Sequence, residues 1–335
     1  MLRKNWALLC CAFLFSLMVF SCGGGRAGGG NVNLQVGMVL TMDSHYGMGL
    51  LEFARLVELY SEGTVTVEIF PNSLLGNERD LIESVSMGTV AMAITATGPI
   101  PNFFPDFAVL DLPYLFPTAE IAYYILDGEV GTYLLNQLPA QGIIGLGFWD
   151  NGFRHVTNNV REIRVPSDLA GLRIRTMEND IHMDTYREYG ASPLPMAFGE
   201  LFLALQQGVI DGQETPAMLI YTSRFHEVQR YMSLTGNFYS AAVLMINRGI
   251  FERMTPGQQY AVTRAATEAK HWQRAFSQEH EQIAIDRIRA SGRTTITEVD
   301  IDVWIAASQG VYRNFEATLN QGLIQRIHAI TRNVQ

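Results

Sequence analysis

A repeated alternation of short apolar strands and amphipathic helices is the feature that most restricts the fold of this 335-residue chain. Three segments near its start have the composition of strands, and they lie at 34–40, 65–70 and 90–95. Two helical segments separate them, at 47–61 and 77–87. Because a β-α-β-α-β order pairs strands in parallel with helices on the sheet faces, it predicts an α/β domain.

The first predicted helix has Leu51, Ala54, Leu56 and Leu59 near one face. Downstream, the apolar stretch 103–116 is expected to seal one domain. The second half has further expected elements: strands at 143–149, 172–176 and 209–211, a helical turn at 167–168, and helices at 180–189, 198–207 and 255–290. Since single cores stop growing near about 250 residues, the length favours two domains, and the last helix is long enough to brace both.

The amino-terminal segment reads as a targeting signal. Arg3 and Lys4 precede an apolar run over 6–20 that is too short for a comfortable membrane span, which predicts a signal peptide over 1–21. Ser21 and Cys22 resemble a bacterial lipoprotein cleavage site, although Phe20 is bulkier than usual there. We expect a lipidated Cys22 followed by a glycine-rich tether over 22–32, with ordinary signal cleavage as the alternative.

Composition and charge exclude several classes of protein. The hydrophobic share of 48% excludes intrinsic disorder, and the net charge of −9 opposes nucleic-acid binding. All three cysteines lie within the first 22 residues, so the folded part has no disulfide or zinc–thiolate site. No HExxH, Walker A, GxSxG or CxxC pattern is present, and His271 and His280 are wrongly spaced for one metal face. We therefore expect no catalytic residue, metal or cofactor.

The segment 171–216, GLRIRTMENDIHMDTYREYGASPLPMAFGELFLALQQGVIDGQETP, is the most informative part of the chain. It closely resembles the signature of the DctP family, the periplasmic solute-binding proteins of TRAP transporters. Further pieces agree in the expected order: NSLLGNERDLIESVSMG at 72–88, VLDLPYLF at 109–116, DNGFRHVT at 150–157 and FHEVQRY at 225–231. The resemblance covers nearly the whole chain beyond the signal peptide.

Arg175 is the main candidate for ligand binding. In the strand that ends the sequence Leu172-Arg173-Ile174-Arg175, alternation places both arginines on one face, with Arg175 nearest the carboxyl end where open α/β sheets present their ligand sites. A guanidinium matches a carboxylate as a planar fork. From spacing alone, a surface arginine or one paired with a core acid is the favoured alternative. The family resemblance implies that Arg175 clamps a substrate carboxylate.

The resemblance extends to five more positions. It implies that Arg154 reaches the ligand at the domain boundary, with a hinge salt bridge as the alternative, and that Phe198 packs on the ligand's carbon face, with core packing as the alternative. Glu178 occupies a position often held by a polar contact residue. Thr215 stands where the family usually has asparagine, so its contact is direct or through water. Asn237 stands where many relatives have histidine, and pocket and hinge roles stay open.

Glu78 matches a position that faces the far end of the ligand. A carboxylate there accepts hydrogen bonds from hydroxyls and repels a second ligand carboxylate, which favours a hydroxylated monocarboxylate, such as a hexuronate or aldonate, over a C4-dicarboxylate. An exposed helix-start residue is the alternative. Relatives that bind sialic acid carry polar residues where this chain has Val39 and Ala96, which disfavours that ligand.

The resemblance implies an α/β, two-domain periplasmic-binding-protein-like fold. Each lobe is a mixed β-sheet flanked by helices, with hinge strands and a long helix bridging the lobes. Lobe I is expected over 33–150 plus 240–280, and lobe II over 151–239 plus 281–335.

The partners implied are a small organic carboxylate, a small DctQ-type and a large DctM-type membrane subunit, and the membrane through the lipid anchor. An accessory lipoprotein is a further possible partner. The expected location is periplasmic and membrane-anchored. A ligand sensor that uses the same cleft, and more remotely a secreted enzyme, are the alternative functions.

Overall fold

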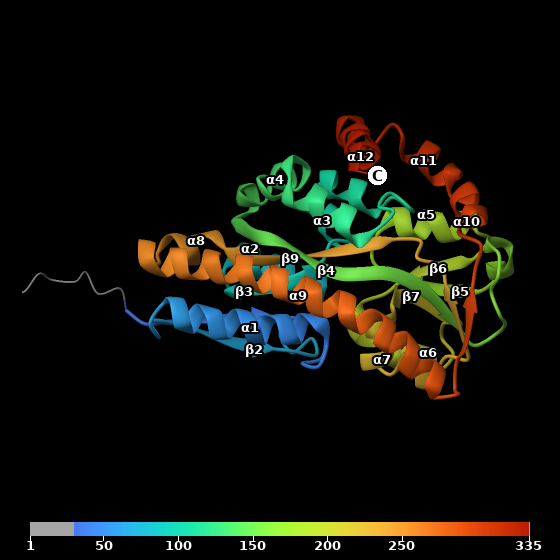
Figure 1. Ribbon diagram of the computed structural model, residues 1–335, viewed down its shortest axis with the longest axis horizontal. Coiled ribbons are helices and arrows are strands. Elements are labelled where there is room, and N and C mark those ends of the chain that lie inside the picture. Colours follow the sequence, from blue (N-terminus) through green and yellow to red (C-terminus); the bar gives the residue numbers. More distant parts are fainter. Residues whose placement is uncertain (1–29, 335) are drawn as a thin grey trace, which may run out of the picture. The chain divides into compact units, whose positions relative to one another are not determined.

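The strand–helix alternation predicted for the start of the chain is present in the computed structural model, which describes residues 30–334 (Figure 1). The elements in order are β1 (Val32–Gly37), α1 (His45–Tyr60), β2 (Val65–Phe70), α2 (Glu78–Met87) and β3 (Met92–Ala96). β1 pairs in parallel with both β2 and β3, and this confirms the predicted pairing. The predicted signal peptide, Cys22 and tether residues 22–29 lie outside the described residues.

The ends of α2 follow from local sequence chemistry. Asn77 caps the amino terminus, and its backbone N–H donates to Oδ2 of Asp80 at 2.9 Å, which completes a capping box. Gly88 ends the helix in the left-handed conformation, with φ of 77°. This cap places Glu78 in the first turn of α2, and its side chain is half-buried.

The prediction of the buried face of α1 is wrong for two of its residues. Leu51 and Leu59 are 45% and 59% exposed. Of the predicted face only Leu56 is buried. The main buried stripe has i, i+4, i+7 spacing and consists of Tyr46, Leu50, Phe53 and Val57. The sequence has apolar residues on both faces of this helix, so periodicity alone did not decide which face the sheet would cover.

Two long antiparallel strands cross the middle of the chain. β4 (Ile143–Asn158) pairs with β9 (Tyr239–Asn247), with bulges between Gly145 and Gly147 and between Asp150 and Gly152. Beyond Phe153, β4 turns to other partners, β7 (Gly212–Pro216) and β8 (Tyr231–Leu234). The predicted strand 143–149 is therefore only the first half of β4, because the bulges break the alternation that would have revealed the rest.

The second half of the chain repeats the α/β arrangement. β5 (Arg173–Thr176) pairs in parallel with β6 (Ser192–Pro195) and β7, and the helices around them are α5 (Asp180–Glu188), α6 (Leu201–Gln206) and α7 (Ala217–Thr222). The strand predicted at 209–211 is wrong, since β7 starts at Gly212. A Cβ at Gly212 would lie 2.1 Å from the Thr157 carbonyl oxygen, so the glycine is what allows β7 to approach β4.

Apolar side chains gather in separate cores on the two sides of the crossing strands. The larger core combines β1, β3, β9 and the first half of β4 with the apolar stretch 103–116, whose predicted burial is confirmed. Two smaller clusters lie in the second half, around α6 and α7 and around α5 and Trp304. Separate cores are the physical mark of domains. The α/β, two-domain class is thus confirmed, whereas the residue boundaries predicted for the two lobes stay a prediction.

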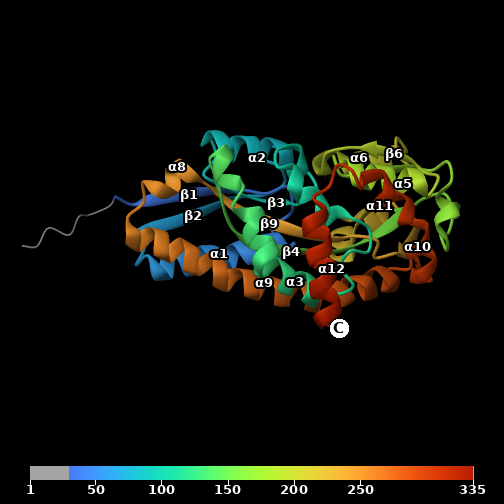
Figure 2. The ribbon, with the colours of Figure 1, turned by 90° about the horizontal axis from the view of Figure 1, so that it is seen from above.

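The long helix predicted at 255–290 is α9 (Pro256–Ala290), which is capped by Thr255. It follows α8 (Arg248–Glu252), and it packs against α1 in the first domain and α7 in the second, so it spans both (Figure 1). After β10 (Thr295–Glu298) come α10 (Ile301–Ala307), α11 (Gln309–Phe315) and α12 (Gln321–Val334). The last of these lies against α3 (Ala119–Asp127) and α4 (Glu129–Leu135), as Figure 2 shows.

The contact of α1 with α9 gives a test of this packing. A Cβ at Gly49 would lie 2.5 Å from the Trp149 ring and 2.7 Å from Cγ of Gln273. Gln273 in turn holds the backbone of Asp150 through two hydrogen bonds of 2.9 and 2.8 Å. We expect Gly49→Ala to lower the free energy of unfolding by about 1–3 kcal/mol, which chemical denaturation would measure.

Gly257→Ala is the matched control. Gly257 lies in the first turn of α9 and has no heavy atom within 4 Å of an added Cβ. The alanine there should leave stability unchanged or raise it by less than about 1 kcal/mol. Equal effects of the two substitutions would contradict the close packing of α1 on α9.

Candidate functional site

Arg175 lies at the carboxyl end of β5 and is only 2% exposed. Its Nε donates to the Met196 carbonyl oxygen at 2.9 Å. Within residues 30–334, no other hydrogen bond and no ion pair within 4 Å engages its guanidinium. Arg173, two residues earlier, is exposed and pairs with Asp211 at 2.6 Å. The two arginines of one strand therefore differ, because only the buried one lacks an acidic partner.

Burial without a partner carries an electrostatic cost for Arg175. Removal from water, followed by repulsion from Arg154, lowers the pKa of its guanidinium to about 10. The group still carries its positive charge near neutral pH. A buried cation of this kind is strongly stabilised by any anion that reaches it.

The Arg175 side chain lines a cavity formed by both domains. The cavity is narrow, with about 270 Å³ of space between the protein atoms, which includes its opening to solvent. Half of the lining residues are apolar and half are polar: Val39, Leu40, Ala96, Met177, Phe198 and Leu219, and Tyr46, Glu78, Asn151, Arg154, Arg175 and Thr215. A half-apolar cavity with convergent polar groups is typical of a small-molecule site.

Arg154, from β4, lines the same cavity but is neutralised within the protein. Its Nε and Nη2 bind the carboxylate of Glu214 on β7, and Nη2 also donates to the Glu214 carbonyl oxygen at 2.7 Å. Nη1 makes no hydrogen bond in the part of the chain that the structure describes. The hinge salt bridge and the position at the cavity, which the sequence treated as alternatives, are thus both present.

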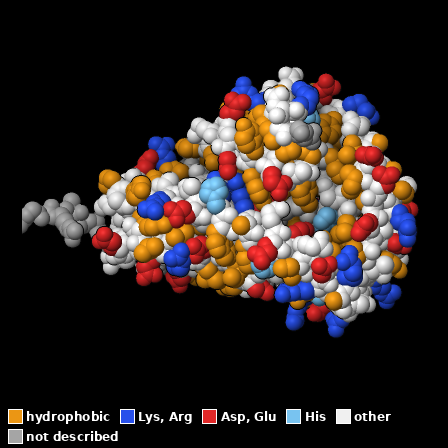
Figure 3. All heavy atoms as spheres, in the orientation of Figure 1, with side chains coloured by type: hydrophobic (Ala, Val, Ile, Leu, Met, Phe, Trp, Pro, Cys, Tyr) orange, Lys and Arg blue, Asp and Glu red, His pale blue; other side chains and the backbone are white. Residues whose placement is uncertain are grey.

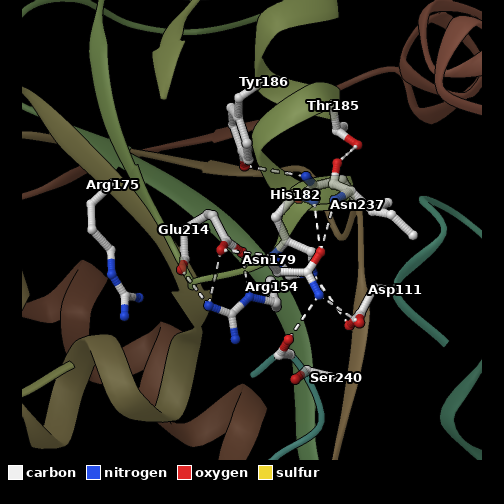
Figure 4. A network of polar contacts seen from close by, with 12 residues as sticks. Asp111, Arg154, Arg175, Asn179, His182, Thr185, Tyr186, Glu214, Asn237 and Ser240 are labelled. Atoms are coloured by element: carbon white, nitrogen blue, oxygen red, sulfur yellow. Dashed lines mark hydrogen bonds and ion pairs between the residues drawn. The ribbon is translucent and has the colours of Figure 1, made fainter. Parts of the chain in front are cut away.

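Glu214 is the centre of a buried polar network that Figure 4 shows. Burial opposes its ionisation, but the charges of Arg154 and His182 lower the pKa of Glu214 to about 2. The ring of His182 is 3.3 Å from the Glu214 carboxylate and 3.5 Å from Asp111, and it stacks on Phe238. Burial works against its protonation, yet these two carboxylates raise the pKa of His182. Arg175 stands apart from this network.

The network also joins the two domains. Asn179, the cap of α5, donates through Nδ2 to Asp111 and to the Gly98 carbonyl oxygen, both at 2.8 Å. Asp111 and Gly98 belong to the first half of the chain, whereas Asn179 and His182 belong to the second. Polar contacts therefore connect the halves close to the cavity.

Three further predicted residues lie in the cavity wall. Phe198, at the start of a 3-10 turn, is half-buried and packs against Phe225 with ring centroids 5.7 Å apart. Thr215, on β7, is 1% exposed, and its hydroxyl makes no hydrogen bond to another described residue. Oε1 of Glu78 accepts a hydrogen bond from the Ala96 N–H at 2.7 Å. Burial raises the pKa of Glu78, although this hydrogen bond and the two arginines favour its ionised form.

Glu178 and Asn237 are not among the residues that line the cavity. Glu178 lies beside the α5 cap and borders a separate surface depression. Asn237 is fully buried behind the site, where it donates to Tyr186 Oη at 3.2 Å and accepts from the Thr235 hydroxyl at 3.0 Å. The structure therefore brings together five of the seven predicted positions: Arg175, Arg154, Phe198, Thr215 and Glu78.

Sequence reasoning missed Tyr46, Asn151 and Glu214. Glu214 stands inside the quoted motif, where an acid followed by Thr215 and Pro216 was the available signal. Tyr46 and Asn151 offered no such signal, because each reaches the cavity only through the packing of α1 and the bulge of β4. For metal binding, no group of three or more His, Cys, Asp or Glu side chains is suitably placed in residues 30–334.

The two-domain α/β fold, with a cavity lined by residues from both halves of the chain, defines a periplasmic-binding-protein-like molecule. In the region the structure describes, none of the helices is both long enough and apolar enough for a transmembrane span. On the face shown in Figure 3, acidic and basic side chains of the described residues are interspersed.

Comparison with known proteins identifies the family. The model described as "Bacterial extracellular solute-binding protein, family 7", DctP, matches residues 36–318. A solute-binding protein of Verminephrobacter eiseniae is 36% identical over 296 residues, which are 88% of each chain.

Solved structures agree with this match. A TRAP periplasmic solute-binding protein from Polaromonas sp. JS666, bound to D-erythronate, is 40% identical with a TM-score of 0.86, over 89% of this chain and 99% of that one. Another from Sulfurospirillum deleyianum, with bound succinate, is 28% identical with a TM-score of 0.86, over 90% and 100%. The chain belongs to the DctP family, whose members are extracytoplasmic solute-binding proteins and not enzymes, so the resemblance seen in the sequence is confirmed.

The Arg154–Glu214 pair gives a stability test. Because Glu214→Gln removes one partner of a buried ion pair, we expect it to lower the free energy of unfolding at neutral pH by about 3–5 kcal/mol. Denaturant titrations at several pH values would measure this. Because the pKa of Glu214 is lowered in the folded protein, the ionised side chain contributes fully to the free energy of unfolding above about pH 4.5. This contribution is lost as the pH falls toward 2, so the stability of the variant should fall less over this pH range.

Glu252→Gln is the control for this prediction. The Arg248–Glu252 pair is about half exposed on both sides, and its loss should change stability little. A Glu214 variant as stable as the wild type would show that the network does not hold the two strands together.

Proposed function

We propose that this chain is the solute-binding subunit of a TRAP-type transporter and that it captures a small hydroxylated monocarboxylate in the cavity at Arg175. The observation that carries the proposal is that Arg175 is 2% exposed and that its guanidinium forms no ion pair within 4 Å with an acid in residues 30–334. A ligand carboxylate would supply that partner through a bidentate pair. Arg154 adds a second positive group, with Glu214 offsetting its charge.

The cavity wall also gives a basis for domain closure. Arg175, Thr215 and Phe198 come from the second half of the chain, whereas Glu78 and Val39 come from the first. A ligand that contacts both domains stabilises the closed form of the protein over the open form. The size of this effect equals the difference between the free energies with which the ligand binds the two forms. Hinge closure about β4 and β9 is the motion that this predicts.

The ligand class follows from the charges and the size of the site. Glu78 places a carboxylate opposite the arginines, so a second ligand carboxylate would meet a like charge, whereas ligand hydroxyls could donate to its free Oε2. The narrow cavity favours a short acid over a bulky one. We favour a sugar acid, an aldonate or a hexuronate, with C4-dicarboxylates as the second class. The apolar side chains of Val39 and Ala96 in the wall are unsuited to sialic acid.

The loaded protein would deliver its ligand to the small DctQ-type and large DctM-type membrane subunits. Family membership supports this step. The amino-terminal sequence supports a periplasmic location with lipidation at Cys22 and a glycine-rich tether, so that the protein stays at the membrane surface. An accessory lipoprotein is a further possible partner.

Arg175→Ala tests the clamp. Loss of a buried guanidinium that pairs with a carboxylate typically costs about 2–5 kcal/mol, so affinity for D-erythronate or another aldonate should fall roughly 30- to 4,000-fold in calorimetric titrations. Arg173→Ala is the matched control, because it removes an exposed arginine from the same strand and should leave the affinity unchanged. Unaltered binding by the Arg175 variant would place the carboxylate elsewhere.

Glu78→Gln tests the choice between ligand classes. Glutamine keeps the acceptor for the Ala96 N–H and removes the negative charge, so a dicarboxylate would no longer meet a like charge. We expect the ratio of succinate affinity to aldonate affinity to rise roughly tenfold, which corresponds to about 1.4 kcal/mol. Competition titrations against a common ligand would give this ratio. If it stays constant, Glu78 does not face the far end of the ligand.

A further inference from the structure

Tyr46 carries a polar atom that the proposed site has not yet used. The residue is 1% exposed and lines the cavity, and its hydroxyl has no hydrogen-bond partner among the described residues. A buried hydroxyl without a partner is costly, because it has given up its bonds to water. An unpaired group in the wall of a ligand cavity is therefore a candidate contact for the ligand itself.

The position of this hydroxyl is fixed by the start of α1. The side chain of Ser44 caps the helix by accepting from the Gly47 N–H at 3.2 Å, and Tyr46 follows in the first turn. The ring packs beside His45, with ring centroids 4.6 Å apart. Burial, followed by the charge of Glu78, raises the pKa of Tyr46 well above its ordinary value. The phenol therefore stays protonated and keeps a hydrogen-bond donor in the cavity.

The surroundings of the hydroxyl restrict what it can bind. Glu78 and Asn151 line the same cavity. Oε2 of Glu78 makes no hydrogen bond within residues 30–334, and neither does Oδ1 of Asn151, whose Nδ2 donates to the Ser240 hydroxyl at 3.1 Å. Beside Asn151, burial lowers the pKa of His45 to about 4, so that ring is neutral at physiological pH. The donor of Tyr46 and these acceptors thus line one cavity, together with Arg154, whose charge Glu214 offsets.

A ligand hydroxyl matches this arrangement better than a carboxylate does. Its oxygen can accept from Tyr46 while its hydrogen is donated to Glu78 or Asn151. A carboxylate oxygen could accept from Tyr46 but would be repelled by Glu78. A methylene group would leave the phenol unpaired, and sites that bind a hydroxyl with buried polar groups reject analogues that lack it.

We propose that Tyr46 is a specificity-determining residue that donates a hydrogen bond to a hydroxyl on the carbon chain of the acid held by Arg175, and so selects hydroxy acids over plain carboxylic acids. This inference rests on the proposed function, because it assumes an acid in the same cavity.

The test compares wild type and Tyr46→Phe in calorimetric titrations with D-erythronate and with matched acids in which one of its hydroxyls is replaced by hydrogen. Phenylalanine keeps the ring and removes only the donor. We expect erythronate affinity to fall roughly 5- to 10-fold in the variant. Binding of the acid that lacks the recognised hydroxyl should be equally weak in both proteins, because the interaction is already absent.

Two controls separate this role from a structural one. Tyr60→Phe alters the other end of α1, where the hydroxyl donates to Glu268 on the surface, and should leave ligand affinity unchanged. Without ligand, Tyr46→Phe should melt at the same temperature as the wild type or higher, because the lost hydroxyl has no partner in the described chain. A structural tyrosine would instead give a lower melting temperature.

The outcomes distinguish the two levels of the proposal. Unchanged erythronate affinity in Tyr46→Phe, or an equal loss for every acid in the series, overturns the role of Tyr46 and leaves the Arg175 clamp intact. If the wild type binds none of these acids, the proposed ligand class itself fails, and the inference on Tyr46 fails with it.

Discussion

The site is organised by the buried guanidinium of Arg175. Three arginines of this region show three ways of placing a guanidinium: Arg173 is exposed and paired with Asp211, Arg154 is buried and paired with Glu214, and Arg175 is buried without an acidic partner in the described chain. Burying a charge costs free energy unless the charge is paired, so Arg175 favours the binding of an anion. The neighbouring pair matters because Glu214 removes the excess charge of Arg154 and leaves one net positive group at the cavity.

The fold explains why this group can be both buried and reachable by a ligand. β4 runs from the core of the first domain into the sheet of the second, and its bulge at Asp150–Gly152 lies just before Arg154. Arg175 on β5 and Thr215 on β7 line the same cavity as Tyr46 and Glu78, which lie in the first turns of α1 and α2. The cavity wall therefore combines residues of both domains, so a ligand would reach Arg175 when the domains separate, as the proposed hinge closure implies.

Much of the fold could be predicted from local patterns. The capped helix α2, the parallel pairing of β1 to β3 and the 35-residue helix α9 follow from periodicity and end signals in the sequence. The face of α1, the full length of β4 and the start of β7 did not, because each is decided by a partner distant in sequence, such as the Thr157 carbonyl against Gly212. Arg175 could be singled out from its strand position together with the family motif. Tyr46 could not, since nothing local marks a tyrosine in the first turn of a helix as part of a cavity.

The charges around the cavity connect affinity to selectivity. One ligand carboxylate would balance Arg175, and Glu214 already balances Arg154, so the site would have little unmatched positive charge for a second carboxylate. Glu78 makes such a group less favourable still, because its carboxyl lies in the same wall. Neutral hydroxyls avoid that repulsion and satisfy groups that apolar carbons would leave unpaired. The best ligand would thus have one carboxylate to pair with Arg175 and only uncharged polar groups elsewhere. Sugar acids have this composition.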